Sequence, residues 1–200
     1  MEKQVFMPLN RNVNIFAALL FLVLMSGCTE SKYSELIKSE MAKGVVHDSL
    51  LFGMKFGQTK QEFFNRCWKL NQQRLVTQST ESKFLRYLRP VKKGGDNSNA
   101  ITMLFYGSFN EENIMTGMDL QFYHEGWSLW NKELQSDQLI YGVKELLTAW
   151  FPGNNFIIVK RDNIEIFVKV DGNRRIIIKP LDDERQVKAK IDDLNYVLEN

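Results

Sequence analysis

Apolar residues recur every three to four positions in two stretches of the chain, and this spacing predicts two long amphipathic helices. The first opens with a capping-box pattern, Thr59–Glu62, in which Thr59 is the N-cap, and runs to about Gln72. The second begins at Ser136 as N-cap and runs to about Phe151, where Pro152 and Gly153 stop it. The apolar faces comprise Phe63, Phe64, Cys67, Trp68 and Leu70 in the first helix and Leu139, Val143, Leu146, Leu147 and Trp150 in the second.

The remaining apolar positions alternate with polar ones, which predicts β-strands with one solvent face. Asp171-Gly172 is a strong hairpin-turn signal between two of these segments. Shorter features are a helix over Ser34–Lys43, an extended segment over Leu50–Gly57 and a connector over Gly126–Leu134. The expected strands cover residues 74–78, 84–89, 101–106, 117–123, 156–160, 164–170, 174–179 and 185–191.

Together these patterns predict an α+β fold in which two long helices pack on an antiparallel β-sheet. Each helix is followed by several strands, so residues 50–125 and 126–200 read as two tandem helix-plus-sheet units. A single α+β domain without internal duplication explains the same pattern equally well. Residues 28–49 form a linker with its short helix ahead of this α+β domain, residues 50–200.

The first residues have the features of a secretory signal peptide. Lys3 and Arg11 precede an unbroken apolar run, Ile15–Met25. This run is too short to span a membrane, which needs about 20 residues, and it fits the h-region of a signal peptide. Residues 1–27 are therefore expected to be cleaved, with Met1 and Met7 both open as the start.

The end of this segment, Leu24-Met25-Ser26-Gly27-Cys28, resembles the lipobox of bacterial lipoproteins, with Met25 where that family has Leu. The resemblance implies a diacylglycerol on the Cys28 sulfur, cleavage before Cys28 and acylation of the new amine. In Gram-negative lipoproteins, an Asp directly after the lipidated Cys retains the protein in the inner membrane. Thr29 stands at this position, so the same resemblance implies an anchor in the outer membrane with the protein facing the periplasm. Several acyl chains would hold the protein stably at the membrane.

Composition narrows the function classes. Hydrophobic residues make up 44% and charged residues 25%, which is globular and argues against disorder. The net charge of +2 gives no basic footprint for nucleic acid. Beyond Cys28, Cys67 is the only other cysteine, and its aromatic neighbours favour a buried thiol over a reactive one.

No catalytic residue, metal ligand set or cofactor motif stands out. His47 and His124 are the two histidines, and neither belongs to a spacing that would bind zinc. His124-Glu125 could form an acid–base pair, and a polar pair at a strand end explains it more simply. A small envelope hydrolase using His124, Glu125 or Cys67 is one alternative reading, and it requires these groups to converge in a cleft.

Two groups of side chains are candidates for an interaction surface. Exposed tryptophans near a turn would act as anchors at a protein interface or as a platform for a glycan, and buried ones would cover the sheet. A gathered basic group would attract an anionic partner, and a solvated sheet face is the alternative. The candidate residues are Tyr123, Trp127 and Trp130 for the aromatic group and Arg86, Arg89, Arg174 and Arg175 for the basic group.

Two further resemblances involve the mature part. The segment Phe56–Phe63, which leads into the first long helix, is similar to the segment that enters the helix of the outer-membrane SmpA/OmlA lipoproteins. The fold of those lipoproteins is a small helix–sheet unit. The β-lactamase-inhibitor-protein fold is built from tandem copies of a related unit. Gln58 stands where those lipoproteins have Met. Phe52–Gly57, Trp130–Leu134 and Val168–Arg175 resemble uncharacterised Bacteroidota lipoproteins, which imply no catalytic residues.

These observations predict a lipid-anchored envelope protein that binds a protein partner and is not an enzyme. The membrane, through Cys28, and an envelope protein are the expected partners. A lipoprotein that binds a small molecule or a glycan is the second alternative, and it requires an apolar pocket near Trp127, Trp130 and Tyr123.

Overall fold

The computed structural model describes residues 31–78, 82–88, 100–161 and 164–198. The chain divides into two units, Met1–Glu35 and Leu36–Asn200, and the fold described below belongs to the second. Within the described ranges no helix is both long enough and apolar enough to cross a membrane.

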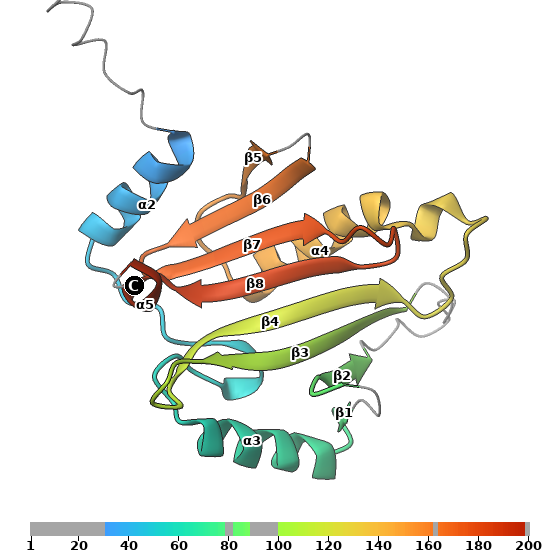
Figure 1. Ribbon diagram of the computed structural model, residues 1–200, viewed down its shortest axis with the longest axis horizontal. Coiled ribbons are helices and arrows are strands. Elements are labelled where there is room, and N and C mark those ends of the chain that lie inside the picture. The colour runs from blue at the N-terminus through green and yellow to red at the C-terminus, as the bar shows by residue number, and fades with distance from the viewer. Residues whose placement is uncertain (1–30, 79–81, 89–99, 162–163, 199–200) are drawn as a thin grey trace, which may run out of the picture. The chain divides into compact units, whose positions relative to one another are not determined.

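An eight-stranded antiparallel sheet dominates the structure (Figure 1). Its strand order is β1-β2-β3-β4-β8-β7-β6-β5, so the first and last four strands meet where β4 pairs with β8. The predicted α+β class with an antiparallel sheet is confirmed, with the sheet as the larger part. The strands are β1 (Thr77–Gln78), β2 (Leu85–Leu88), β3 (Ile101–Phe109), β4 (Met115–His124), β5 (Ile157–Arg161), β6 (Ile164–Asp171), β7 (Arg174–Pro180) and β8 (Val187–Asp193).

Helices lie around this sheet. In Figure 1, α4 runs behind the sheet, where it contacts β4, β7 and β8, and α3 contacts β3. The open face of the sheet, opposite α4, therefore faces the viewer. The helices are α2 (Lys32–Ala42), α3 (Lys60–Gln72), α4 (Ser136–Trp150) and α5 (Leu194–Leu198), with short 3₁₀ turns at η1 (Leu51–Gly53) and η3 (Lys132–Leu134).

Local sequence signals account for the start of α3 and for the β6–β7 hairpin. Thr59 accepts a hydrogen bond from the Glu62 N–H, and the Glu62 carboxylate accepts one from the Thr59 N–H, which is the predicted capping box. The hairpin closes through Gly172 and Asn173, one position later than the expected Asp171-Gly172 turn. Gly172 has φ +54°, a backbone conformation that glycine adopts readily.

Other local expectations were wrong. Ser136 does not cap α4 but is its first residue, because Gln135 holds the extended N-cap position and makes no side-chain cap bond. The segment expected to be extended over residues 50–57 contains the η1 turn, where Phe52 has φ +57°. In this turn the Phe52 carbonyl accepts a hydrogen bond from Arg66 Nε at 2.5 Å.

The hydrophobic core lies between the inner face of the sheet and the helices. The buried stripe of α4 matches the prediction for Leu139, Val143, Leu146 and Leu147. In α3, only Phe63, Cys67 and Leu70 are buried. Phe64 and Trp68 are 43% and 62% exposed, so the broad apolar face predicted for this helix is wrong. At about 100° per residue, these two side chains point well away from Phe63 and Cys67.

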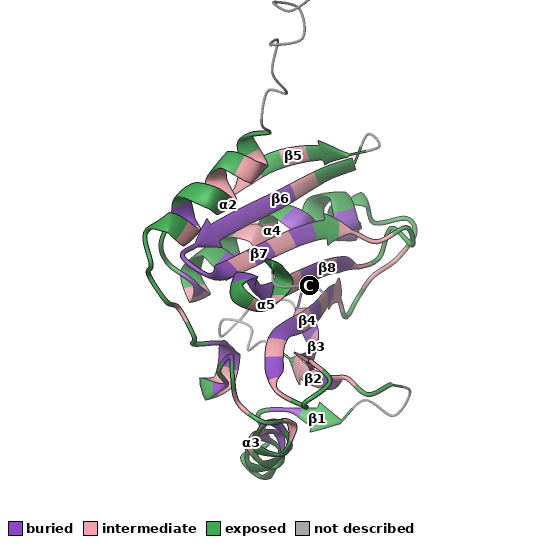
Figure 2. Ribbon diagram, turned by 60° about the vertical axis from the view of Figure 1, so that its left-hand side comes forward, coloured by how far each residue is buried: buried purple, intermediate pink, exposed green. Residues whose placement is uncertain are grey.

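The two ends of the sheet differ, and both matter for the candidate site. We call the end with the β3–β4 turn (residues 110–114) and the β6–β7 turn (residues 172–173) the hairpin end. The opposite end, with residues 125–135 and 181–186, is the loop end. The first residues of the unit Leu36–Asn200, which we call the compact unit, lie at the hairpin end. There the Glu40 carboxylate accepts a hydrogen bond from the Gly172 N–H at 3.2 Å. Figure 2 shows β6 buried toward this end and β5 exposed.

Candidate interaction surface

The loop that leads from β4 to α4 is held in shape by one amide side chain. Gln135 accepts a hydrogen bond from Trp127 Nε1 at 3.2 Å and donates to the carbonyls of Ser128 and Asn131 at 3.0 and 3.2 Å. Asn131 adds a side-chain bond from the Glu133 N–H at 3.1 Å, which starts the η3 turn. These bonds fix the backbone on both sides of residues 129 and 130.

Two adjacent apolar side chains project from this braced loop. Trp130 is 89% exposed and Leu129 is 61% exposed, and we call this pair the Trp130 tip. Trp127 is half-buried and lies against Arg185, whose guanidinium carbon is 4.2 Å from the indole ring centroid. The sequence placed Trp127 and Trp130 together as candidates, but the structure gives them different roles: Trp127 packs and Trp130 projects.

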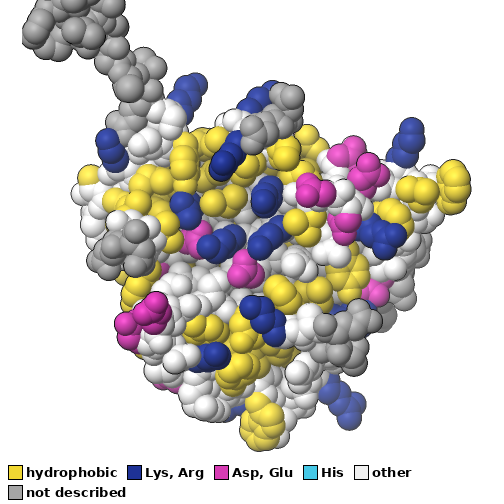
Figure 3. All heavy atoms as spheres, in the orientation of Figure 1, with side chains coloured by type: hydrophobic (Ala, Val, Ile, Leu, Met, Phe, Trp, Pro, Cys, Tyr) yellow, Lys and Arg dark blue, Asp and Glu magenta, His cyan; other side chains and the backbone are white. Residues whose placement is uncertain are grey.

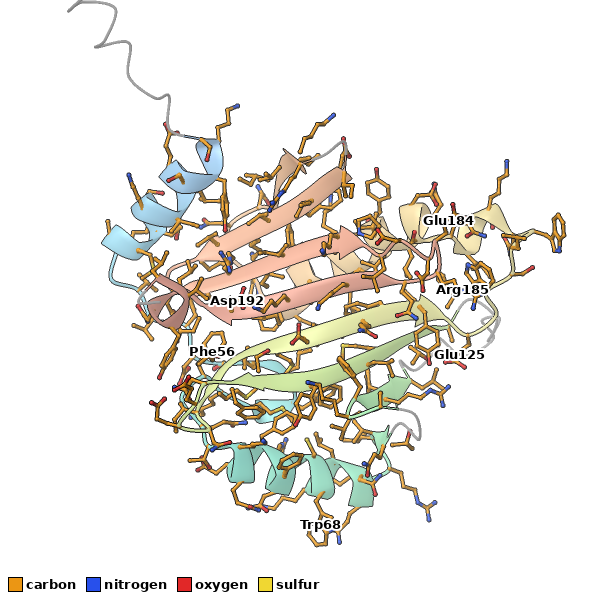
Figure 4. The ribbon with its side chains drawn as sticks, viewed as in Figure 1. Phe56, Trp68, Glu125, Glu184, Arg185 and Asp192 are labelled. Carbon is orange, nitrogen blue, oxygen red and sulfur yellow. The ribbon has the colours of Figure 1, made fainter. Side chains whose placement is uncertain are left out.

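Acidic residues lie at the same end of the sheet. The Ser136 N–H donates to the Glu184 carbonyl at 2.9 Å and so joins the β7–β8 loop to the start of α4. Asp182, Asp183 and Glu184 are all exposed. Figure 4 shows Glu184 and Arg185 at this end of the sheet, and in Figure 3 acidic side chains gather over the same region.

Arg86 and Glu125 form an ion pair on the open face, near the loop end. Arg86 Nη2 is 2.7 Å from Glu125 Oε1, and the Thr102 hydroxyl donates to the same oxygen. Burial alone would raise the pKa of Glu125, but the bonds from Thr102 and Arg86 outweigh it and lower the pKa below its ordinary value. Glu125 is therefore ionised near neutral pH, which does not suit a general acid. Tyr123, on β4 two residues before Glu125, is half-buried.

The predicted basic group does not come together on one surface. Arg174 is only 5% exposed and belongs to the interior of the hairpin end. Arg175 lies on the open face of β7 with Nη2 2.7 Å from Asp192 Oδ2. Three strands separate β2, which carries Arg86, from β7, so at about 4.8 Å per strand spacing these arginines lie at least roughly 19 Å apart across the sheet. Arg89 lies outside the described residues.

Basic side chains on the open face alternate with acidic ones, as Figure 3 shows. Lys188 Nζ is 3.4 Å from Asp119 Oδ1, and Lys190 Nζ is 2.9 Å from Asp192 Oδ1. This pattern corresponds to the solvated sheet face that the sequence left as the alternative to a basic patch.

The groups considered for catalysis are distributed over different elements. Cys67 is buried on α3, and the cavity beside it is lined by neither His124 nor Glu125. The His47 N–H donates to Asn173 Oδ1 at 2.6 Å, at the hairpin end. Among the residues that the structure describes, no cluster of three or more His, Cys, Asp or Glu side chains could hold a metal ion.

We expect Cys67 to be chemically inert in the folded protein. Burial raises the pKa of its thiol to about 12, and the thiolate is the reactive form. In the Cys28→Ala chain, where Cys67 is the single thiol, iodoacetamide at pH 8 should label it at least 100-fold more slowly than after unfolding in urea. Labelling at equal rates in both states would contradict this burial.

Two exposed aromatic residues on α3 were not anticipated as surface residues. Phe64 and Trp68, together with Cys67, Asn71, Gln78, Lys83 and Leu85, line a cavity of about 250 Å³ between α3 and the β1–β2 edge. The helical spacing could have predicted their exposure. Phe64 and Trp68 are four residues apart, so they share one face of the helix, and Phe63 and Leu70 lie on another. Leu129 was also missed, since nothing in its sequence context marks it as exposed.

Comparison with known proteins gives no match. No protein-family model, no curated protein and no solved structure is significantly similar to this chain.

Proposed function

We propose that this chain is a lipid-anchored protein of the bacterial envelope that binds another protein through the Trp130 tip and catalyses no reaction. The observation that carries the proposal is the 89% exposure of Trp130 beside an exposed Leu129 on a loop braced by Gln135. A large apolar side chain held in water is unfavourable unless a partner covers it, and tryptophan is enriched at the centres of protein interfaces. Bracing the loop in advance also reduces the entropy lost on binding.

The position of the Trp130 tip suits an anchored protein. The compact unit begins at Leu36, shortly after the proposed anchor at Cys28, and its first residues contact the hairpin end. The Trp130 tip lies at the loop end, beyond the last residue of β4. The ten residues of β4 span roughly 30 Å. Within this unit the Trp130 tip therefore lies at the opposite end of the sheet from the contact that Glu40 makes with Gly172.

A protein partner fits the tip better than a small molecule does. Small-molecule sites are concave and enclose most of their ligand. The Trp130 tip projects, and cavities of about 680, 340 and 250 Å³ are lined by other residues. The exposed acidic side chains of the β7–β8 loop favour a partner whose apolar pocket is bordered by basic residues. The hydrolase alternative receives no support from the burial of Cys67 or from the ion pair of Glu125.

Cross-linking in the native envelope tests this proposal, followed by pull-down of the wild-type chain and of Trp130→Ala. We expect a defined partner whose recovery falls at least tenfold in Trp130→Ala, as for an interface anchor. Ile158→Ala on β5 is the matched control, because it removes another large apolar side chain that is more than half exposed, and it should leave recovery unchanged. Cys28→Ala tests the anchor separately, through its effect on membrane fractionation. Equal recovery from wild type and Trp130→Ala would overturn the role of the tip.

We further propose that the fold consists of two tandem helix-plus-sheet units. In chain order, α3 precedes β1–β4 and α4 precedes β5–β8. The β4–β8 pairing joins both sets of strands into one sheet. This order is that expected from a β-lactamase-inhibitor-protein-like arrangement.

A further inference from the structure

The cavity between α3 and the β1–β2 edge, which we call the α3 cleft, has a mixed lining. Phe64, Cys67 and Trp68 from the helix and Leu85 from β2 supply apolar walls. Asn71, Gln78 and Lys83 supply the polar groups. Its volume of about 250 Å³ is below the usual size of a site for a drug-sized ligand and suits a single side chain or ring.

The aromatic walls of the α3 cleft are exposed although the helix is firmly placed. Phe64 and Trp68 are one turn apart, and the capping box and the buried Phe63, Cys67 and Leu70 fix the helix beneath them. Figure 4 shows Trp68 projecting from α3. Exposed aromatic rings beside a hollow of this size offer edge and face contacts to an apolar group.

Among the described residues that line the α3 cleft, Lys83 is the only charged one and none carries a carboxylate. The Lys83 ammonium lies 4.7 Å from the centroid of the Tyr106 ring, and within the described part of the chain it forms no ion pair with a carboxylate. An ammonium beside an apolar hollow favours a ligand that carries a negative charge next to its apolar group.

We propose that the α3 cleft binds a carboxylate attached to an apolar or aromatic side chain, such as the C-terminal residue of a peptide. The side chain lies between Phe64, Trp68 and Leu85, and the carboxylate accepts hydrogen bonds from the Lys83 ammonium. Gln78, which also lines the cleft, would bond the adjacent peptide group through its side-chain amide. This site is separate from the Trp130 tip and does not depend on the function proposed for it.

Two probes that differ only in charge test the proposal: N-acetyl-L-phenylalanine and N-acetyl-L-phenylalaninamide, titrated into the full chain. Tryptophan fluorescence reports occupancy, and Trp68→Phe identifies the part of the signal that comes from the cleft. We expect the acid to bind about tenfold more tightly than the amide, as for a charge-assisted hydrogen bond. Lys83→Gln should abolish that preference.

Lys60→Gln is the matched control, because Lys60 also lies over an aromatic ring, that of Phe109, but does not line the cleft. It should retain the preference for the acid. A pentapeptide ending in phenylalanine, with a free or an amidated terminus, separates the sources of the ligand. Tighter binding of the free-terminus peptide than of the acetylated amino acid indicates a protein terminus, and equal binding indicates a small metabolite. Equal affinity for acid and amide, or no saturation by either probe, would overturn the proposal.

Discussion

Replacing Asp171 with alanine is expected to lower the free energy of unfolding by about 3–5 kcal/mol, because it leaves a buried cation without its counter-charge. Lys169 is fully buried, and its Nζ lies 3.3 Å from Asp171 Oδ2. Arg174 Nη2 lies 3.6 Å from the same oxygen, and the Asn154 N–H donates to Oδ1 at 2.6 Å. Burial lowers the pKa of Arg174, and the attraction of Asp171 only partly offsets this effect.

Urea denaturation of the wild-type and variant chains measures this loss. Asp119→Ala is the control, because Asp119 pairs with Lys188 on the open face, where both side chains are about one-third exposed. Such a pair should contribute about 0–1 kcal/mol. Combining Asp171→Ala with Lys169→Met should recover part of the loss, since the buried charge is then removed. If Asp171→Ala cost no more than Asp119→Ala, the buried network would not stabilise the hairpin end.

Replacing Gly172 with alanine is expected to lower the free energy of unfolding by about 2–5 kcal/mol, the second large effect. A left-handed backbone costs an L-residue about 1–2 kcal/mol, and forced overpacking adds about 1–3 kcal/mol. At Gly172, φ is +54° and an added Cβ would lie 2.1 Å from the Val45 carbonyl oxygen. The neighbouring backbone would have to move, and with it the bond from the Gly172 N–H to Glu40.

Gly44→Ala separates the two causes of this loss. Gly44 has φ +64°, close to that of Gly172, and an added Cβ there would meet no atom within 4 Å. It should therefore show the conformational cost alone, about 1–2 kcal/mol. Thermal unfolding of both variants gives the comparison. Equal losses in the two variants would show that residues 45–47 do not pack against the hairpin as the structure places them.

The sequence by itself predicted the elements whose signals are local. The capping box at Thr59 and Glu62 predicts the start of α3, because both partners lie within one turn. The Asp171-Gly172 signal located the β6–β7 hairpin to within one residue. The spacing of Leu139, Val143 and Leu146 predicts the buried stripe of α4. The proposed lipid anchor at Cys28 also rests on local sequence alone, because Cys28 lies outside the described residues.

The candidate sites depended on contacts between distant parts of the chain. Arg174 has the sequence features of a surface residue, yet Phe151, Asp171 and the Ser49 carbonyl surround it. Trp127 and Trp130 are close in sequence, but the Gln135 amide and Arg185 hold one inward and leave the other exposed. Phe64 and Trp68 form a cleft only because the β1–β2 edge lies opposite them.

Periodicity therefore determined which residues form helices and strands, and it determined the α+β class. It did not determine strand order, because the β4–β8 pairing joins strands separated by the whole of α4 and β5–β7. The exposure of an aromatic or the burial of a charge depends on what packs against it. For Trp130, Trp68 and Arg174 those neighbours are set by the tertiary structure, so only the tertiary structure decided where this protein can bind.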